Sequence, residues 1–143
     1  MVIRELLWGS MDYAAAIAMR NELLCLPVGA TVFERDLREE KDFFHIAAFD
    51  DTGNMIGTLM LRPESETQFH VNQVATLPAL RGTGIGHALM TYAEDFARAK
   101  GVRILVLDAR MYALHFYQSC GYTVYDEEFG RPELRLVPMR KMI

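Results

Sequence analysis

The sequence is short of the residues that mark several classes of protein. It has only two cysteines in 143 residues, Cys25 and Cys120, too few for a disulfide scaffold and not spaced as metal ligands. No apolar run approaches the ~18 residues that a membrane span needs, and the N-terminus lacks the build of a signal peptide. Neither charge predominates, since 15 Lys and Arg face 19 Asp and Glu, whereas a general nucleic-acid or anionic-membrane binder is usually basic. We therefore expect a cytoplasmic protein without metal, nucleic-acid or membrane partners.

The remaining composition is that of an ordinary globular domain. Hydrophobic residues make up 51% of the chain and charged residues 24%. A chain of this length buries roughly two-thirds of its unfolded surface, which is enough for a full core. No repeat, low-complexity tract or Pro/Gly/Ser-rich linker divides the sequence, so we predict a single domain over residues 1–143.

The first half predicts one helix and a run of antiparallel strands. Ser10 can cap a helix from Met11 to about Cys25, which Pro27 and Gly29 end. Two apolar runs flank the turn residues 50–54, which is typical of a hairpin. The strands that we predict are Met1–Leu7, Phe43–Phe49, Met55–Leu61 and Gln68–Thr76, with a short charged helical segment over Glu34–Lys41.

The second half predicts a strand–helix–strand unit. In Gly84–Lys100 the apolar residues recur at steps of three and four, which places them on one face of a helix that Gly101 can end. The continuous apolar run Val102–Leu107 is typical of a buried strand. A helix over Met111–Cys120 and strands over Tyr122–Tyr125 and Glu133–Met139 follow, the last at an edge or bulge because it contains Pro138. The predicted fold class is α+β, a single domain with a mixed, mostly antiparallel sheet flanked by helices.

One segment carries chemistry, the glycine-rich loop that joins a strand to a helix within Val74–Gly86. Free amides and the helix dipole at such a helix start favour an anion, and glycines let the backbone approach a phosphate closely. The Gly-Lys-Ser/Thr ending of a nucleotide-binding Walker loop is missing. A dinucleotide fingerprint fails at its third glycine, where His87 stands, although Asp108 lies where a ribose-binding acid could be. The preceding hairpins also argue against a dinucleotide-binding sheet.

Two motifs resemble the GCN5-related N-acetyltransferase (GNAT) family. Arg81-Gly82-Thr83-Gly84-Ile85-Gly86 is similar to its coenzyme A signature, Arg/Gln-x-x-Gly-x-Gly/Ala. Residues 113–122, Ala-Leu-His-Phe-Tyr-Gln-Ser-Cys-Gly-Tyr, resemble its Ala-x-x-Phe-Tyr-x-x-x-Gly-Phe/Tyr block. The resemblance covers about a third of the chain, from Val74 to Tyr125, and implies the acyl-CoA N-acyltransferase fold with splayed central strands.

The resemblance also implies roles for individual residues. Backbone amides of the loop would hold the coenzyme A pyrophosphate, and a bulged strand would pair with the pantetheine arm. An amide near Val74 or Ala75 would polarise the thioester carbonyl. Tyr117 matches the family's frequent general acid, beside the coenzyme A sulfur. The implied cofactor-binding residues are Val74, Ala75, Thr76, Arg81, Gly82, Thr83, Gly84, Ile85, Gly86, His87 and Ala88.

The proton acceptor is less well marked. An aliphatic amine is protonated at pH 7 and must lose a proton before it can attack a thioester. His70 lies near the position where some family members keep a glutamate or histidine, and its ordinary pKa of ~6.5 suits this role. Glu34 and Glu66 are alternatives, as is a water held by Asn72 or Gln73.

Two further features have plain structural interpretations. The acidic run within residues 34–42 could attract a cationic amine, but a solvated helix face with a Glu34–Arg38 pair is the commoner arrangement. Cys120 follows Tyr117 by three residues, yet no histidine is placed by the sequence to activate it, which favours a structural cysteine.

Together these observations predict an acetyl-CoA-dependent N-acetyltransferase that transfers the acetyl group directly to a small-molecule amine. Two alternative functions would use the same loop to bind acyl-CoA: a protein or peptide N-acetyltransferase, and a non-catalytic acyl-CoA-binding module that regulates a partner. The resemblance also allows a homodimer.

Overall fold

The strands of the first half form an antiparallel meander. In the computed structural model, which describes residues 1–143, β1 (Val2–Leu6), β2 (Phe44–Phe49), β3 (Met55–Pro63) and β4 (Gln68–Thr76) pair in sequence order. These limits agree closely with the predicted strands, because the turns between them are marked by polar residues and glycine.

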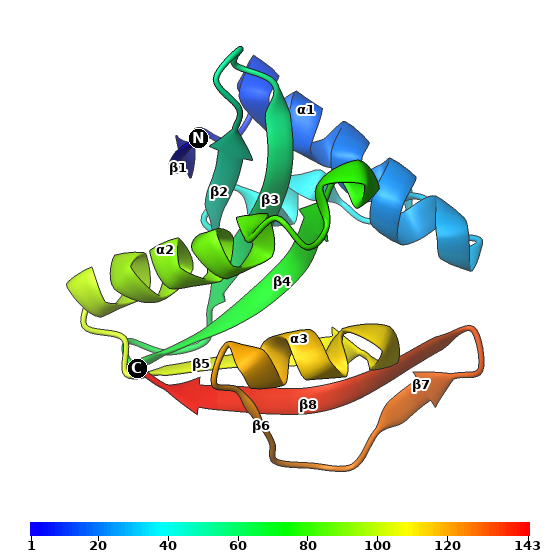
Figure 1. Cartoon of the computed structure of the whole chain (residues 1–143), viewed down its shortest axis with the longest axis vertical. Coiled ribbons are helices and arrows are strands. Elements are labelled where there is room, and N and C mark those ends of the chain that lie inside the picture. The colour runs from blue at the N-terminus through cyan, green and yellow to red at the C-terminus, as the bar shows by residue number, and fades with distance from the viewer.

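A crossover helix then makes the sheet mixed. α2 (Ile85–Ala99) joins β4 to the parallel strand β5 (Ile104–Arg110), and β8 (Leu134–Met142) runs antiparallel to β5. The sheet order is β1-β2-β3-β4-β5-β8-β6, with β6 (Thr123–Val124) and β7 (Phe129–Arg131) both pairing with β8. The α+β prediction is confirmed, and Figure 1 shows the meander above and the β5–β8 layer below.

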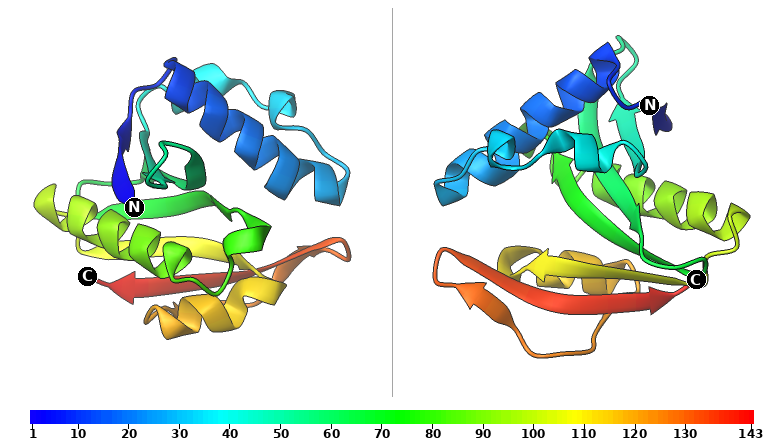
Figure 2. Two further views of the ribbon diagram at one scale, coloured as in Figure 1. Left: turned by 45° about the horizontal axis from the view of Figure 1, so that its top comes forward. Right: turned by 180° about the vertical axis from the view of Figure 1, so that it is seen from behind.

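Helices cover both faces of the sheet. α2 and the short α3 (Leu114–Ser119) lie on one face, and α1 (Met11–Arg20) lies on the other (Figures 1 and 2). The main core lies under α2, where Leu89, Met90 and Ala93 meet alternate side chains of the central strands. No helix is long and apolar enough to cross a membrane.

The first helix is less regular than expected. It is α-helical to Arg20, continues as a π-helical turn over Asn21–Cys25 and closes as a 3-10 turn over Leu26–Val28. Gly29 ends it with a φ of +77°, as predicted. Pro27 has no amide to continue the helical hydrogen bonds, and the helix ends within the next two residues.

The predicted charged helical segment over Glu34–Lys41 is confirmed only in part. The chain instead forms two separate 3-10 turns, Val32–Glu34 and Leu37–Glu40. Asp36 caps the second turn and pairs with Arg38, so the expected Glu34–Arg38 pair does not form. An Asp side chain that binds the amide two residues later favours such a break.

The acidic run is also not a uniformly solvated face. Glu40 is 3% exposed and forms an ion pair with the buried Arg20 of α1. The apolar periodicity around Glu40 is too short to reveal that this one carboxylate turns inward.

Three details of the last third also differ from the prediction. Met111–Cys120 is a 3-10 turn followed by α3, and β7 was not predicted. Pro138 lies inside the sheet, in β8, rather than at an edge. The carbonyl of Pro138 accepts a hydrogen bond from the Tyr125 amide, so the nitrogen of Pro138 also faces Tyr125. Tyr125 lies just beyond the end of β6, so the missing N–H of the proline breaks no hydrogen bond between paired strands.

Candidate active site

The central strands diverge and open the sheet. β4 and β5 pair only from Gln68–Val71 to Ile104–Leu107, and beyond these residues they separate, as Figure 1 shows. The β3–β4 register shifts within the same stretch, and Gln73 there is the one non-glycine residue with positive φ, +56°. The bulge therefore lies immediately before Val74, and it turns the end of β4 away from β5.

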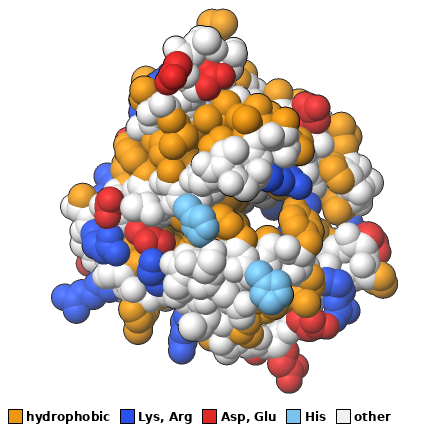
Figure 3. Space-filling model, in the orientation of Figure 1, with side chains coloured by type: hydrophobic (Ala, Val, Ile, Leu, Met, Phe, Trp, Pro, Cys, Tyr) orange, Lys and Arg blue, Asp and Glu red, His pale blue; other side chains and the backbone are white.

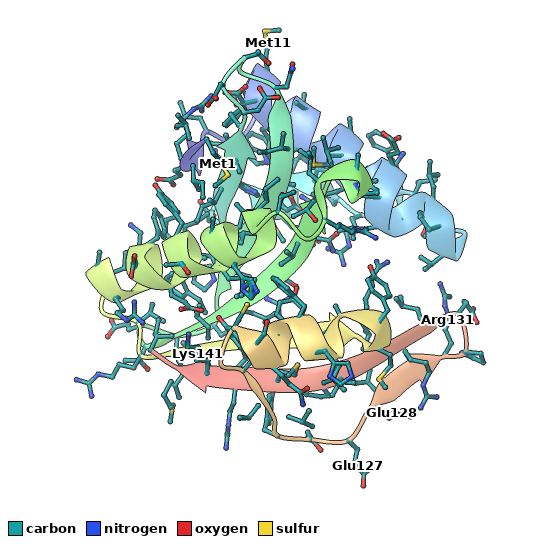
Figure 4. All side chains as sticks on the ribbon, in the orientation of Figure 1. Met1, Met11, Glu127, Glu128, Arg131 and Lys141 are labelled. Atoms are coloured by element: carbon teal, nitrogen blue, oxygen red, sulfur yellow. The ribbon has the colours of Figure 1, made fainter.

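A cavity of about 890 Å³ fills this opening. Its walls come from β4 and β5, the start of α2, α3, the turns after α1, and the β7–β8 hairpin. Figure 3 shows the surface hollowed to the right of centre, with hydrophobic atoms at the rim. Figure 4 labels Arg131 at the tip of the β7–β8 hairpin, which bounds the opening on its lower side.

Unpaired amides line the cavity at the start of α2. The amide of Thr83 donates to Leu80 and that of Ala88 to Gly84, and neither residue lines the cavity. Arg81 lines it, but its amide donates to Pro78. The amides with no acceptor belong to cavity residues: Gly82, Gly84, Ile85, Gly86 and His87. A cluster of such donors at a helix start is suited to bind a phosphate.

The three loop glycines do not serve one purpose. Gly82 and Gly84 have φ of +82° and +90° with open space where a side chain would begin. A Cβ on Gly86 would instead lie 2.8 Å from the ring of Phe116. The first two glycines permit the turn and the approach of a ligand, and the third permits close packing of α2 on α3.

Tyr117 lies at the floor of the cavity. It is 7% exposed, its ring packs edge-on against Phe116 and Tyr122, and its hydroxyl forms no hydrogen bond within the chain. Burial raises the pKa of Tyr117 well above its ordinary value, and Tyr112 and Cys120 add to the shift. The phenol therefore stays protonated and can donate a hydrogen bond into the cavity.

His70 lies on the opposite face of β4 from its core neighbours. Its Nδ1 is 3.3 Å from Arg62 Nη2, and its Nε2 is 3.5 Å from Asp108 Oδ2. The pKa of His70 is lowered, mainly by burial, although Asp108 and Glu64 act in the opposite direction. The imidazole is thus neutral at pH 7 and lines the cavity together with Asp108.

The other base candidates differ in position. Glu34 lines the cavity, but its carboxylate accepts from the amide of Thr31. Glu66 lies in the exposed β3–β4 turn and does not line the cavity. Asn72 and Gln73 both line it, beside the bulge.

Cys120 has a histidine neighbour that the sequence does not reveal. Its Sγ lies 3.3 Å from Nδ1 of His87, a residue 33 positions away in the chain. Burial raises the pKa of the Cys120 thiol, which is the reverse of an activated nucleophile. His87 also lies 3.3 Å from the Ser119 hydroxyl. The contact therefore fastens α2 to α3.

Sequence reasoning missed the residues that close the cavity on the α1 side. Arg110 at the end of β5 donates a hydrogen bond of 2.8 Å to the carbonyl of Leu24 in the π-helical turn. Arg35 also lines the cavity, in the turns after α1, and Arg131 lines it from the β7–β8 hairpin. No motif marks these residues, because they come from separate elements. The chain holds no group of three or more His, Cys, Asp and Glu side chains that could bind a metal ion.

The comparisons with known proteins agree with this geometry. The model of the acetyltransferase (GNAT) family matches residues 3–122. The chain belongs to this family. The predicted resemblance is confirmed, and it extends well beyond the two motifs that carried it.

Individual GNAT relatives are more distant. A glucosamine 6-phosphate N-acetyltransferase of Trypanosoma brucei brucei is 29% identical over 83 residues, 54% of this chain. The match spans 56% of that protein, so the chain covers only about half the length of this relative.

Solved structures cover nearly all of the chain. A Lactobacillus plantarum protein assigned as an N-acetyltransferase superposes with a TM-score of 0.84 at 26% identity, over 99% of both chains. An aminoglycoside 6'-N-acetyltransferase complexed with coenzyme A has a TM-score of 0.78 at 16% identity, over 99% of this chain and 97% of its own. The second likeness shows the fold alone.

Proposed function

We propose that this GNAT protein transfers the acetyl group of acetyl-CoA directly to a primary amine of a small molecule. The observation that carries the proposal is a single cavity that joins the unpaired amides of the Gly82–His87 loop to the Tyr117 hydroxyl through the opening between β4 and β5. A phosphate cradle at one end and a buried proton donor further in match the two ends of an acyl-CoA.

The residues fit the cosubstrate along its length. The five free loop amides would hold the pyrophosphate, with the side chain of Arg81 beside them. The edge of β4 from Asn72 to Thr76 has no β5 partner, so its main chain can pair with the amides of the pantetheine arm. When bound, acetyl-CoA supplies an acetyl group activated as a thioester.

Tyr117 would act on the leaving group. Its hydroxyl faces the cavity and stays protonated, so it can donate a hydrogen bond to the thiolate that develops as the C–S bond breaks. An amide near Val74 or Ala75, beside the bulge at Gln73, would stabilise the negative charge on the thioester oxygen. His70, on the acceptor side of the opening, would take part in removing the proton from the amine.

A small acceptor is supported by the way the cavity is closed. The Arg110–Leu24 hydrogen bond spans the α1 side of the opening, and the β7–β8 hairpin bounds it below. A volume of about 890 Å³ has to hold the end of the cosubstrate as well as the acceptor, which leaves little room for a folded protein substrate. Two of the compared proteins are named for an amino sugar phosphate and an aminoglycoside, both small amines.

A two-step experiment tests the proposal. Thermal unfolding is first compared with acetyl-CoA, coenzyme A and NAD at matched excess. A ligand at ~100 times its Kd adds about 2.7 kcal/mol of stability, which shifts the Tm by several degrees. Stabilisation by both coenzyme A forms and not by NAD is expected, and the absence of any coenzyme A effect would overturn the assignment of the loop.

The second step separates an enzyme from a binding module. Coenzyme A release is followed with a thiol reagent while amino sugars, aminoglycosides, and peptides with free N-termini or lysines are added in turn. Release that requires a small amine and falls in a Tyr117→Phe variant supports the proposal. Release only with peptides would reassign the acceptor, and binding without any release would favour a regulatory module.

A further inference from the structure

The acceptor side of the opening contains a carboxylate at the point where the strands part. Val71 and Leu107 form the last β4–β5 pair, so Asp108 is the first β5 residue beyond the pairing. Its side chain is 35% exposed and lines the cavity. A group at this position can meet an amine that approaches the opening from the α1 side.

One hydrogen bond of the His70 ring determines which of its nitrogens carries the proton. Arg62 Nη2 lies 3.3 Å from Nδ1, and a guanidinium can only donate, so Nδ1 accepts. The single proton of the neutral ring is then on Nε2, which faces Asp108 Oδ2 at 3.5 Å. The ring consequently has no free lone pair directed at the cavity.

We propose that Asp108 is the group that accepts the proton of the acceptor ammonium, and that His70 is a positioning residue that holds Asp108 through Nε2–H. The inference rests on the proposed acetyl transfer and refines the part that His70 plays in it. Because one carboxylate oxygen faces His70, the other is left for the amine.

The charges around the pair suit a cationic acceptor. Glu64 Oε2 lies 3.7 Å from His70 Nδ1 and 3.5 Å from Arg62 Nη2, so the arginine is balanced by Glu64. On the β8 side, Arg140 lies over the ring of Tyr125. Arg35, Arg110 and Arg131 also line the cavity, but none of them forms an ion pair with Asp108, whose one close partner is the neutral imidazole. The carboxylate therefore keeps its charge for an ammonium.

The proton balance of the transfer closes with these residues. An ammonium R–NH₃⁺ loses one proton to Asp108, and the freed amine forms the N–C bond with the acetyl carbon as the C–S bond breaks. The second nitrogen proton ends on sulfur, so the products are an amide and a thiol. Asp108 then returns its proton to water, which it can reach because its side chain is partly exposed.

The first test compares two acceptors that differ in their need for a base. Methylamine is an ammonium at pH 7, whereas hydroxylamine is largely unprotonated, so only methylamine has to lose a proton before attack. In an Asp108→Asn variant, kcat/KM for methylamine is expected to fall about 100-fold or more, and for hydroxylamine by no more than about threefold. The Kd for acetyl-CoA, measured by calorimetry, is expected not to change.

Matched variants separate positioning from proton transfer. A glutamine at position 70 places an N–H near the position of the histidine Nε2–H but cannot take up a proton. If His70 only positions Asp108, His70→Gln should retain about a third or more of the wild-type kcat, whereas His70→Ala should lower kcat about tenfold. Glu66→Gln removes an equal charge in the exposed β3–β4 turn, outside the cavity, and should leave kcat/KM for both acceptors within about twofold of the wild-type value. Equal losses in His70→Gln and His70→Ala, with an active Asp108→Asn, would make His70 itself the base.

A measurement that needs no acceptor completes the design. The ¹⁵N shifts of the His70 ring report its tautomer directly, and a proton on Nε2 is expected at pH 7. A proton on Nδ1 would overturn the proposal. A wild-type protein that binds acetyl-CoA but releases no coenzyme A with either acceptor would refute the proposed function itself, whatever the tautomer of His70.

Discussion

Arg20 and Glu40 form a buried, two-pronged ion pair beneath α1. The distances Nη1–Oε1 and Nη2–Oε2 are both 2.7 Å, and both side chains are almost fully buried. Tyr13 donates a third hydrogen bond to the Glu40 carboxylate at 2.9 Å, and burial together with Glu40 raises the pKa of Tyr13 to about 12. Burial is the largest single influence and raises the pKa of Glu40, but the hydrogen bonds and charge of Arg20, the hydrogen bond from Tyr13 and the nearby His45 together hold the pKa below its usual value.

Replacing Glu40 should therefore destabilise the fold. We expect Glu40→Gln to lower the free energy of unfolding by about 3–5 kcal/mol at pH 7, because it leaves the Arg20 charge buried and unpaired. A carboxylate with a lowered pKa stabilises the folded state above its unfolded pKa and loses this effect as the pH falls through the folded value. Urea unfolding at pH 7 and at acidic pH should show that the stability difference between the wild type and Glu40→Gln becomes smaller as the pH falls. Glu39→Gln, at an exposed position, is the control.

Gly82 and Gly101 make a matched pair for testing the phosphate cradle. Both have left-handed φ, +82° and +86°, and both have open space at the position of a side chain. Alanine at either position should cost about 1–2 kcal/mol of stability. Only Gly82→Ala should also weaken the binding of acetyl-CoA, by roughly 10- to 100-fold, since a methyl group there obstructs hydrogen bonds to a charged ligand. Titration calorimetry on both variants makes the comparison, and equal affinities would contradict the cradle.

Variants at Tyr117 and Tyr122 distinguish an effect on catalysis from an effect on stability. Tyr117→Phe should lower kcat about 100-fold and leave the Kd for acetyl-CoA within about threefold, because in the proposed mechanism the hydroxyl acts only on the leaving thiolate. Tyr122 is buried outside the cavity, with its hydroxyl 3.0 Å from Glu94 Oε2. Tyr122→Phe should cost about 1–3 kcal/mol of stability and leave kcat unchanged. A Tyr117→Phe variant with wild-type kcat would remove this residue from the mechanism.

Local signals explain why the fold was largely predictable. The limits of β4 and α2 follow from polar turns, glycines and a clear helical period, all of which lie within a few residues of the element that they define. The Gly82–Gly86 motif and the block around Tyr117 likewise depend on short stretches of sequence. These two segments supply almost all of the residues that we propose for the cofactor side of the site.

The acceptor side could not be predicted in the same way. The Asp108–His70 contact depends on how β4 and β5 are aligned, and the Arg110–Leu24 hydrogen bond joins residues far apart in the chain. The split of residues 32–40 into two 3-10 turns depends on Asp36 binding a nearby amide, and the burial of Glu40 depends on a partner in α1. Such contacts are set by tertiary structure and leave no periodic pattern.

The Arg110–Leu24 hydrogen bond provides a last prediction, on the acceptor. Because it ties the end of β5 to the π-helical turn across the cavity, its loss should loosen the acceptor side alone. We expect Arg110→Met to raise the acceptor KM about tenfold, as the loss of one charged hydrogen bond of about 1.5 kcal/mol would, with the Kd for acetyl-CoA unchanged. Arg103→Met, an exposed position just before β5, should change neither value. Steady-state kinetics with the amine found active makes the measurement, and an equal loss of acetyl-CoA affinity would show that Arg110 supports the whole opening instead.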